Sequence, residues 1–298
     1  MKEFDSLNEA IKALYGSEEE IKERRTVSGG DINRAYILRL SDGSELFMKE
    51  NSRKNLDFFR AEVLGLAALK ETGTLKIPEV KALGTDGDSA FLLMEAVNSG
   101  IRKRGFFEEF GIELAAMHMA DTDSFVPGGR YGFYEDNYIG SGFQKNTAKD
   151  KWIDFFRECR LEPQLERASR YFDETDRKRQ LRFLDRLDSF LYEPERPALL
   201  HGDLWGGNYM CGSDGEPVLI DPAVYVGCNE ADIAMTELFG GYDRAFYSSY
   251  WKSYKYAVPG YEDRRDIYNL YHLLNHLNLF GASYLSSVRG IIGRYEKE

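Results

Sequence analysis

Three polar residues close together in the sequence have the types and spacing of a phosphoryl-transfer site. Residues 201–208 read HGDLWGGN, in which four residues separate Asp203 from Asn208. In kinase catalytic loops with this spacing, the aspartate accepts the proton of the attacking hydroxyl and the asparagine holds a metal ion. Asp221 follows the next apolar run, residues 218–220, at the place of a second metal-binding carboxylate. We predict Asp203 as the catalytic base, and Asn208 and Asp221 as magnesium ligands.

The flanking sequence distinguishes an active site from an ordinary turn. An HGD tripeptide alone is more often a turn, because glycine and aspartate favour tight turns. Here short apolar segments, which we expect to be strands, lie on either side of the loop at 198–200 and 209–211, and a third follows the turn at 213–215. Polar groups at the ends of neighbouring strands can converge on one point, so the pattern favours catalysis. Farther along, we expect Asp232 to brace the catalytic loop rather than to perform chemistry.

The N-terminal part of the chain contains groups suited to the phosphates of a nucleotide. Gly29 and Gly30 lie between two predicted strands, where backbone amides can approach phosphates closely. A Gly-Gly pair is equally typical of a plain hairpin. No GxxxxGK[ST] motif occurs, which excludes a Walker-type phosphate loop. Lys49, in the predicted strand 46–50, is placed to reach the α and β phosphates.

Glu62 supports this role for Lys49. A buried carboxylate is costly unless it is paired with a cation, and Lys49 is the candidate partner. A strand lysine paired with a helix glutamate positions the phosphates in kinases. The alternative is that Glu62 reaches solvent at the edge of its helix. We expect Glu62 to be buried because it belongs to an apolar stripe of the predicted helix 55–71, together with Phe58, Ala61, Gly65, Leu66 and Leu69.

The segment that ends the N-terminal part is a candidate adenine site. An apolar strand over 91–94 runs into a short linker, so Met94, Glu95 and Ala96 offer backbone N–H and C=O groups to an adenine edge. Without the other motifs, the same segment is equally typical of a core strand.

Trp205, His272 and His276 are candidate substrate contacts. Trp205 is the second residue after the predicted base, and its flat apolar face suits a sugar ring or an amine. A tryptophan in a loop can also anchor the hairpin. His272 and His276 are one helical turn apart but lack the carboxylate of an HExxH zinc motif. We therefore favour a polar wall of the substrate cleft, or a core network, over a zinc site.

Residue patterns predict two lobes joined near 94–98. We expect an α+β, bilobal fold with a small β-rich N-terminal lobe, 1–95, and a larger, mainly helical C-terminal lobe, 96–298. A first helix over 7–14 ends before Gly16, and later apolar periodicities predict longer helices over 106–119, 152–171, 176–191 and 266–285.

Composition narrows the class of protein. The 298 residues include 39 basic and 50 acidic side chains, a formal net charge of −11. This argues against nucleic-acid binding, which depends on Lys and Arg that neutralise phosphates. The 3 cysteines follow no metal-binding spacing, which favours a reducing compartment. Because no apolar run is long enough to span a membrane and no secretory leader is present, we expect a cytoplasmic protein without a membrane partner. The oligomeric state is not predicted.

With these residues identified, the chain resembles the fructosamine-3-kinase (ketosamine-3-kinase) family, which is related to aminoglycoside phosphotransferases within the protein-kinase-like superfamily. The resemblance implies phosphorylation of the 3-hydroxyl of a ketosamine, free or protein-bound, with ATP and Mg²⁺ as cofactors and release of the amine. Residues 227–230, GCNE, depart from the GHRE that is common in the family. The likeness covers most of the chain and is carried by 28–36, the Lys49 strand, 136–140, 144–146, Trp152, 155–156, 201–208, 230–236 and 271–281.

Other functions remain open at this point. An aminoglycoside- or choline-type phosphotransferase would share the HGDxxxxN motif. A metal-dependent phosphatase is disfavoured, because only His201 of the 4 histidines lies near the acidic residues. A non-catalytic nucleotide-binding protein would be expected to lack the base, the lysine or a metal ligand, and all are present.

Overall fold

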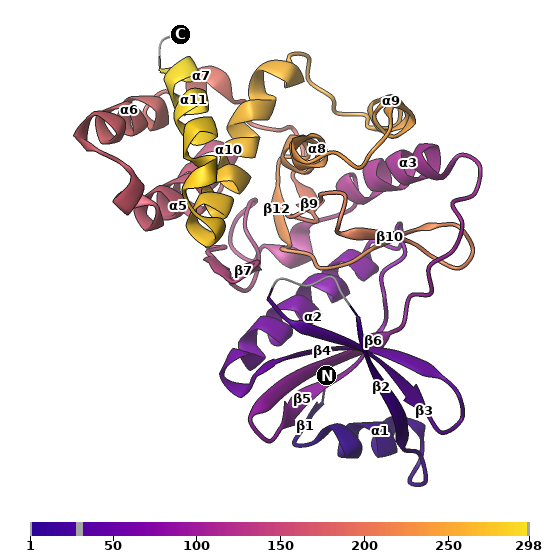
Figure 1. The fold of residues 1–298 in the computed structure, drawn as a ribbon. Coiled ribbons are helices and arrows are strands. Elements are labelled where there is room, and N and C mark those ends of the chain that lie inside the picture. Colours follow the sequence, from indigo (N-terminus) through magenta and orange to yellow (C-terminus); the bar gives the residue numbers. More distant parts are fainter. Residues whose placement is uncertain (1, 28–31, 297–298) are drawn as a thin grey trace.

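The computed structural model describes residues 2–27 and 32–296. The predicted phosphate-binding glycines, Gly29 and Gly30, lie outside these residues. Figure 1 shows a sheet with two helices in one part of the molecule and a larger, mainly helical part beside it. The N-terminal part contains β1 (Glu3–Phe4), α1 (Leu7–Tyr15), β2 (Ile21–Val27), β3 (Arg34–Leu40), β4 (Glu45–Ser52), a 3₁₀ turn (Arg53–Asn55), α2 (Leu56–Glu71), β5 (Val80–Asp86) and β6 (Ser89–Glu95).

The six strands form one sheet in the order β1-β5-β6-β4-β3-β2. All neighbours pair antiparallel except β1, which is too short for a sequence signal and pairs parallel with β5. Alternate residues of a strand face opposite sides of the sheet. In β6, Phe91 and Leu93 accordingly join the core under α1, whereas Leu92 and Met94 join the core shared with α2. This double burial explains why the strand is continuously apolar.

The first helix ends as its sequence predicts. The Ser6 side chain accepts a hydrogen bond from the Glu9 N–H at the start of α1, and Gly16 follows the helix with a φ of 118°. Its apolar face buries Leu7, Ala10 and Ile11. Leu14, which has the same helical spacing, lies at the edge of this face and is 41% exposed.

The C-terminal part is mainly helical, with three small two-stranded sheets formed by β7 with β8, β9 with β12, and β10 with β11. Its elements are α3 (Phe106–His118), β7 (Asn137–Ile139), β8 (Gly142–Gln144), α4 (Trp152–Phe155), a π-helix (Phe156–Leu161), α5 (Glu162–Arg167), α6 (Glu174–Leu184), α7 (Leu187–Phe190), β9 (Ala198–Leu200), β10 (Tyr209–Cys211), β11 (Pro217–Leu219), β12 (Tyr225–Gly227), α8 (Glu230–Leu238), α9 (Arg244–Ser253), α10 (Tyr261–Phe280) and α11 (Leu285–Tyr295), with 3₁₀ turns at Asp123–Phe125, Ser169–Tyr171 and Ala282–Tyr284.

The strands expected around the catalytic loop are confirmed, but three helix predictions need correction. The helix predicted over 266–285 begins earlier, at Tyr261, and ends at Phe280 because Gly281 adopts a φ of 95°, which is unfavourable for other residues. The helix predicted over 176–191 stops at Leu184 and resumes as the short α7.

The third correction concerns the helix predicted over 152–171, which widens into a π-helix at 156–161 and ends at Arg167. Pro163 has no N–H to donate to the carbonyl of Cys159, so the regular α-helical bond there is lost. The buried Arg160 guanidinium donates to that carbonyl instead, at 2.9 Å. The proline is therefore accommodated by a change in helix type rather than by a break.

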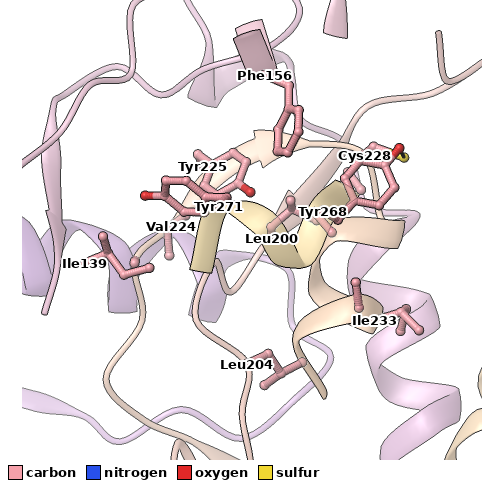
Figure 2. Close-up of a cluster of buried hydrophobic side chains, with 14 of the residues drawn as sticks. Ile139, Phe156, Leu200, Leu204, Val224, Tyr225, Cys228, Ile233, Tyr268 and Tyr271 are labelled. Carbon is pink, nitrogen blue, oxygen red and sulfur yellow. Dashed lines mark hydrogen bonds between the residues drawn. The ribbon is translucent and has the colours of Figure 1, made fainter. Parts of the chain in front are cut away.

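A large apolar core lies directly behind the catalytic loop. Figure 2 shows some of its side chains, which come from the small strands, the π-helix, the catalytic loop, α8 and α10. Leu204, the neighbour of Asp203, is fully buried in this core. Its burial fixes the loop from behind and leaves Asp203 at the surface of the packed region.

Candidate active site

The catalytic loop follows β9 and makes a tight turn that only glycine permits. Gly202 has a φ of 81°, and a Cβ atom there would lie 1.9 Å from the carbonyl oxygen of Ala223. The Trp205 N–H donates to the Asp203 carbonyl at 3.1 Å, and the Asn208 N–H donates to the Trp205 carbonyl at 2.9 Å. These bonds curl the loop so that Asp203 and Asn208 face each other.

Asp203, Asn208 and Asp221 meet at one point, as predicted. The Asn208 Nδ2 atom donates to the Asp203 backbone oxygen at 2.8 Å and to its Oδ2 at 3.1 Å. A longer contact of 3.4 Å reaches the backbone oxygen of Asp221. Among the described residues other than glycine, only Asp221 has a positive φ, of 55°. Such a strained conformation is costly, and functional sites are where it is commonly found.

The environment of Asp203 alters its acidity. Burial raises the pKa of Asp203 to about 7, the Asn208 hydrogen bond opposes this rise, and the Asp221 charge adds to it. The carboxyl side chain nevertheless remains 20% exposed. A proton acceptor of this kind is suited to work near neutral pH.

Lys49 connects the two parts of the molecule. Its Nζ atom lies 2.6 Å from Glu62 Oε1 on α2 and 2.5 Å from Asp221 Oδ1, 172 residues away in sequence. Burial by itself lowers the pKa of Lys49, but the charges of Asp221 and Glu62 outweigh it and the net pKa is raised. The predicted pairing of Lys49 with Glu62 is confirmed, and the alternative of a solvated Glu62 is wrong: its side chain is 12% exposed.

Gly65, one turn beyond Glu62, lets α2 approach the segment after Asp221. A Cβ at this position would lie 3.2 Å from Val224 Cγ2 and 3.5 Å from Pro222 Cγ. A larger side chain would push the helix away from this segment. The glycine that looked like one member of an apolar stripe therefore lies where α2 packs closely on the segment after Asp221.

Asp232 braces the catalytic loop, as predicted. Its carboxylate, on α8, accepts hydrogen bonds from the backbone N–H groups of His201 at 2.7 Å and Gly202 at 2.9 Å. The His118 Nε2 atom lies 3.2 Å from the same carboxylate. Burial alone would raise the pKa of Asp232, but the His118 hydrogen bond and charge leave it below its ordinary value.

Two supporting histidines were not identified from the sequence. His201, fully buried, donates from Nε2 to the Ile220 carbonyl at 2.9 Å and accepts the Asp203 N–H on Nδ1 at 3.3 Å. It therefore ties the catalytic loop to the segment before Asp221. His118 has no sequence signal, because a single histidine within a helix is unremarkable until its partners are known.

The GCNE departure from the family pattern lies behind this brace. Asn229 donates from Nδ2 to the Tyr250 hydroxyl at 2.9 Å, and that hydroxyl lies 2.8 Å from His118 Nδ1. Cys228 is buried with its Sγ 3.6 Å from the hydroxyls of Tyr192 and Tyr268. Neither residue contacts the predicted base or metal ligands.

The three predicted substrate residues differ in exposure. Trp205 is 40% exposed, so it is not a buried hairpin anchor. His272 is buried, and its Nδ1 lies 4.0 Å from Asp203 Oδ1 with no hydrogen-bond partner among the described residues. Burial, followed by the influence of His276, lowers the pKa of His272 to about 3. The half-buried His276 donates from Nδ1 to the His272 carbonyl at 2.8 Å.

The predicted adenine-binding segment lies at the end of β6. Met94 is buried, while Glu95 and Ala96 are half-buried. The Glu95 N–H already donates to the Glu79 carbonyl at 2.8 Å. Ala96 lies just outside the strand.

The donors at the site fit a magnesium ion. Carboxylate and amide oxygens suit Mg²⁺, which typically takes one or two protein ligands and completes its shell with phosphates and water. The Asp221 side chain is 40% exposed, and within the described part of the chain no donor occupies the Asn208 Oδ1 atom. Residues 2–27 and 32–296 contain no cluster of three or more His, Cys, Asp or Glu side chains arranged for a metal.

Within residues 2–27 and 32–296, every helix is either too short or too polar to cross a bilayer.

Known proteins are similar to this chain over most of its length. A family model described as fructosamine kinase matches residues 3–298. A probable ketoamine kinase of Synechocystis is 39% identical over 94% of this chain and 92% of its own length. A chloroplastic protein-ribulosamine 3-kinase of Oryza sativa is 41% identical over 91% of this chain and 78% of its own.

Solved structures agree with the match to the fructosamine kinase family model. A candidate fructosamine-3-kinase from Haemophilus somnus superposes with a TM-score of 0.85 and 29% identity, covering 97% of this chain and 96% of that one. A type I macrolide 2'-phosphotransferase shares the fold alone, with a TM-score of 0.63 and 15% identity over 100% of this chain and 98% of that one. The predicted α+β, protein-kinase-like fold is confirmed. The chain belongs to the fructosamine kinase family.

Proposed function

We propose that this chain transfers the terminal phosphoryl group of ATP to the 3-hydroxyl of a ketosamine, the adduct of a sugar and an amine. The observation that carries the proposal is the connection of five residues from both parts of the molecule. Lys49 contacts Glu62 and Asp221, and Asn208 joins Asp221 to Asp203. The names of the relatives, ketoamine kinase and protein-ribulosamine 3-kinase, support the substrate class.

Each residue then has a role that its position supports. Asp203 accepts the proton of the attacking hydroxyl. Asn208 and Asp221 hold Mg²⁺, which when bound neutralises charge on the phosphates. Lys49, kept in place by Glu62, orients the phosphates, and Gly29 and Gly30 supply backbone amides to them. Met94, Glu95 and Ala96 border the adenine.

The substrate side of the site is formed by Trp205, His272 and His276. A buried polar atom without a partner is costly, because it has lost its hydrogen bonds to water. The Nδ1 atom of His272 is such an atom beside Asp203, so a hydroxyl of the sugar is its natural partner. Trp205 offers its exposed ring to the sugar face. We assign the neutral His272 to sugar orientation and His276 to the wall beside it.

The product chemistry follows from the substrate. A phosphate on the 3-oxygen is a leaving group: it is eliminated as inorganic phosphate, and water then hydrolyses the resulting carbon–nitrogen double bond, which sets the amine free. The substrate is therefore a small-molecule or protein-bound ketosamine, and the consequence is deglycation. We place the protein in the cytoplasm.

The test is a substrate panel followed by ADP release in the presence of MgATP. The panel contains lysine adducts derived from fructose, ribulose and erythrulose, together with an aminoglycoside and choline. We expect ADP formation with at least one lysine adduct and a 3-phosphate in its product by NMR. Activity with the aminoglycoside or choline alone would contradict the proposal, and no ATP turnover with any acceptor would favour a non-catalytic protein.

Replacement of the base tests the site itself. We expect Asp203→Asn to fold normally and to turn over at least ~10²-fold slower, the usual contribution of a general base. Asp214→Asn, in the exposed turn between β10 and β11, is the matched control and keeps wild-type rates. Activity of Asp203→Asn within a few-fold of wild type would refute the assignment.

A further inference from the structure

A strip of aromatic rings leads away from the catalytic loop. The aromatic strip consists of Trp205, Phe239, His276, Phe280 and Tyr284. Ring centroids are 6.5 Å apart from Trp205 to Phe239 and 4.8 Å apart from Phe239 to His276. From His276 they are 5.3 Å to Phe280 and 5.1 Å to Tyr284. Each ring therefore neighbours the next, and the series begins two residues after Asp203.

The strip is attached firmly to the catalytic loop. Phe239 follows α8 and precedes Gly240 and Gly241, which have φ values of 74° and 107°. The loop backbone packs directly on this turn: a Cβ at Gly206 would lie 2.8 Å from the Gly240 carbonyl oxygen. The Tyr209 hydroxyl donates to the Gly241 carbonyl at 2.7 Å. Phe239 is therefore held at a fixed position relative to the catalytic loop.

The exposure of these rings indicates a ligand-binding surface. Phe239 is 42% and Phe280 52% exposed, although large aromatic side chains are usually buried. Contiguous exposed apolar surface beside an active site is typical of a ligand-binding surface. The strip is also uncharged, since its one titratable imidazole, His276, is half-buried and burial lowers its pKa. It offers stacking and apolar contact and no ion pair.

We infer that Phe239 and Phe280 are specificity-determining residues that bind the amine-bearing portion of the substrate, and that this portion is a peptide with apolar or aromatic residues beside the modified lysine. The inference rests on the proposed function. With the sugar hydroxyl at Asp203 and the sugar ring on Trp205, the amine portion leaves the site across the strip. A free amino acid, with its charged ends, gains little from uncharged rings, whereas an apolar peptide side chain stacks on them.

The experiment compares three ketosamines that carry the same sugar. One has a small N-alkyl amine, one is a hexapeptide with phenylalanine beside the glycated lysine, and one is the same hexapeptide with glycine at those positions. Wild type is expected to show the lowest KM for the phenylalanine peptide. Phe239→Ala and Phe280→Ala each raise that KM ~3–10-fold, the contribution of one aromatic contact, without changing kcat. The KM for the small amine stays within two-fold.

Leu181→Ala is the matched control, because Leu181 is 58% exposed on α6, outside the strip. It leaves all three KM values unchanged. If the two phenylalanine variants keep the preference for the phenylalanine peptide, or raise KM equally for all three substrates, the inference is overturned while the proposed function stands. If wild type phosphorylates none of the three, the proposed function fails and the inference falls with it.

Discussion

Asp232 offers the sharpest test of how the catalytic loop is held. In Asp232→Asn, one carboxylate oxygen becomes an NH₂ group. Because Oδ1 accepts from Gly202 and Oδ2 accepts from His201, either orientation of the amide leaves one backbone N–H facing a donor. A buried N–H without an acceptor costs about 1–3 kcal/mol. For a chain of 298 residues that corresponds to a fall in Tm of roughly 2–5 °C, at ~1.6 °C per kcal/mol.

The same change displaces the loop that carries the proposed base. A shift of about 1 Å in a catalytic group costs up to ~10²-fold in rate, so we expect kcat to fall by about 10-fold to 10²-fold. The KM for ATP changes little, because Asp232 contacts none of the proposed nucleotide-binding residues. The assay is the initial rate of ADP formation at a temperature where circular dichroism shows both proteins folded, and calorimetry gives Tm.

A control separates positioning from general stability. Asp173 caps α6 by accepting the Asp176 N–H at 2.8 Å, at the other end of the C-terminal part from the catalytic loop. Asp173→Ala should cost ~1 kcal/mol, the usual value of an N-cap, with kcat unchanged. If Asp232→Asn lost stability yet kept kcat within two-fold, the brace would be merely structural, and the His201 contact with Ile220 would suffice to hold the loop.

Two further predictions concern buried charges. Lys49→Met should destabilise the fold by about 3–5 kcal/mol, because it leaves Glu62 buried without a cation. The double variant Lys49→Met with Glu62→Leu should recover most of the unfolding free energy but no kinase activity. Recovery of kinase activity in the double variant would show that Lys49 has no role with phosphates. Burial and the Glu109 charge raise the pKa of Glu113 to about 7, above its ordinary 4.5. The unfolded chain therefore loses this proton first, and the unfolding free energy of wild type should fall relative to Glu113→Gln as pH rises from about 4.5 to 7. Urea titrations at pH 4, 6 and 8 measure the unfolding free energies of wild type and Glu113→Gln. A difference between the two free energies that does not grow with pH would contradict the raised pKa of Glu113.

The sequence by itself determined the local parts of the site. The spacing of Asp203 and Asn208 within an eight-residue segment, the strands around them and the glycine at 202 all depend on neighbouring residues. The pairing of Lys49 with Glu62 also followed from local patterns, because a carboxylate within an apolar helix face demands a cation. Alternation and helical periodicity are properties of residues close together in the sequence, so they predict strands and helices without any knowledge of the fold.

Only the tertiary structure decided the remainder. The contact of Lys49 with Asp221 joins residues 172 apart, and the close approach of α2 at Gly65 depends on packing between the two parts of the molecule. His118 has no signal in the sequence, and the aromatic strip assembles rings from three separate segments. Hydrophobic periodicity also failed to predict the π-helix before Pro163 and the early end of α10. Long-range contacts depend on which surfaces pack together in the folded chain, and the spacing of neighbouring residues does not encode this.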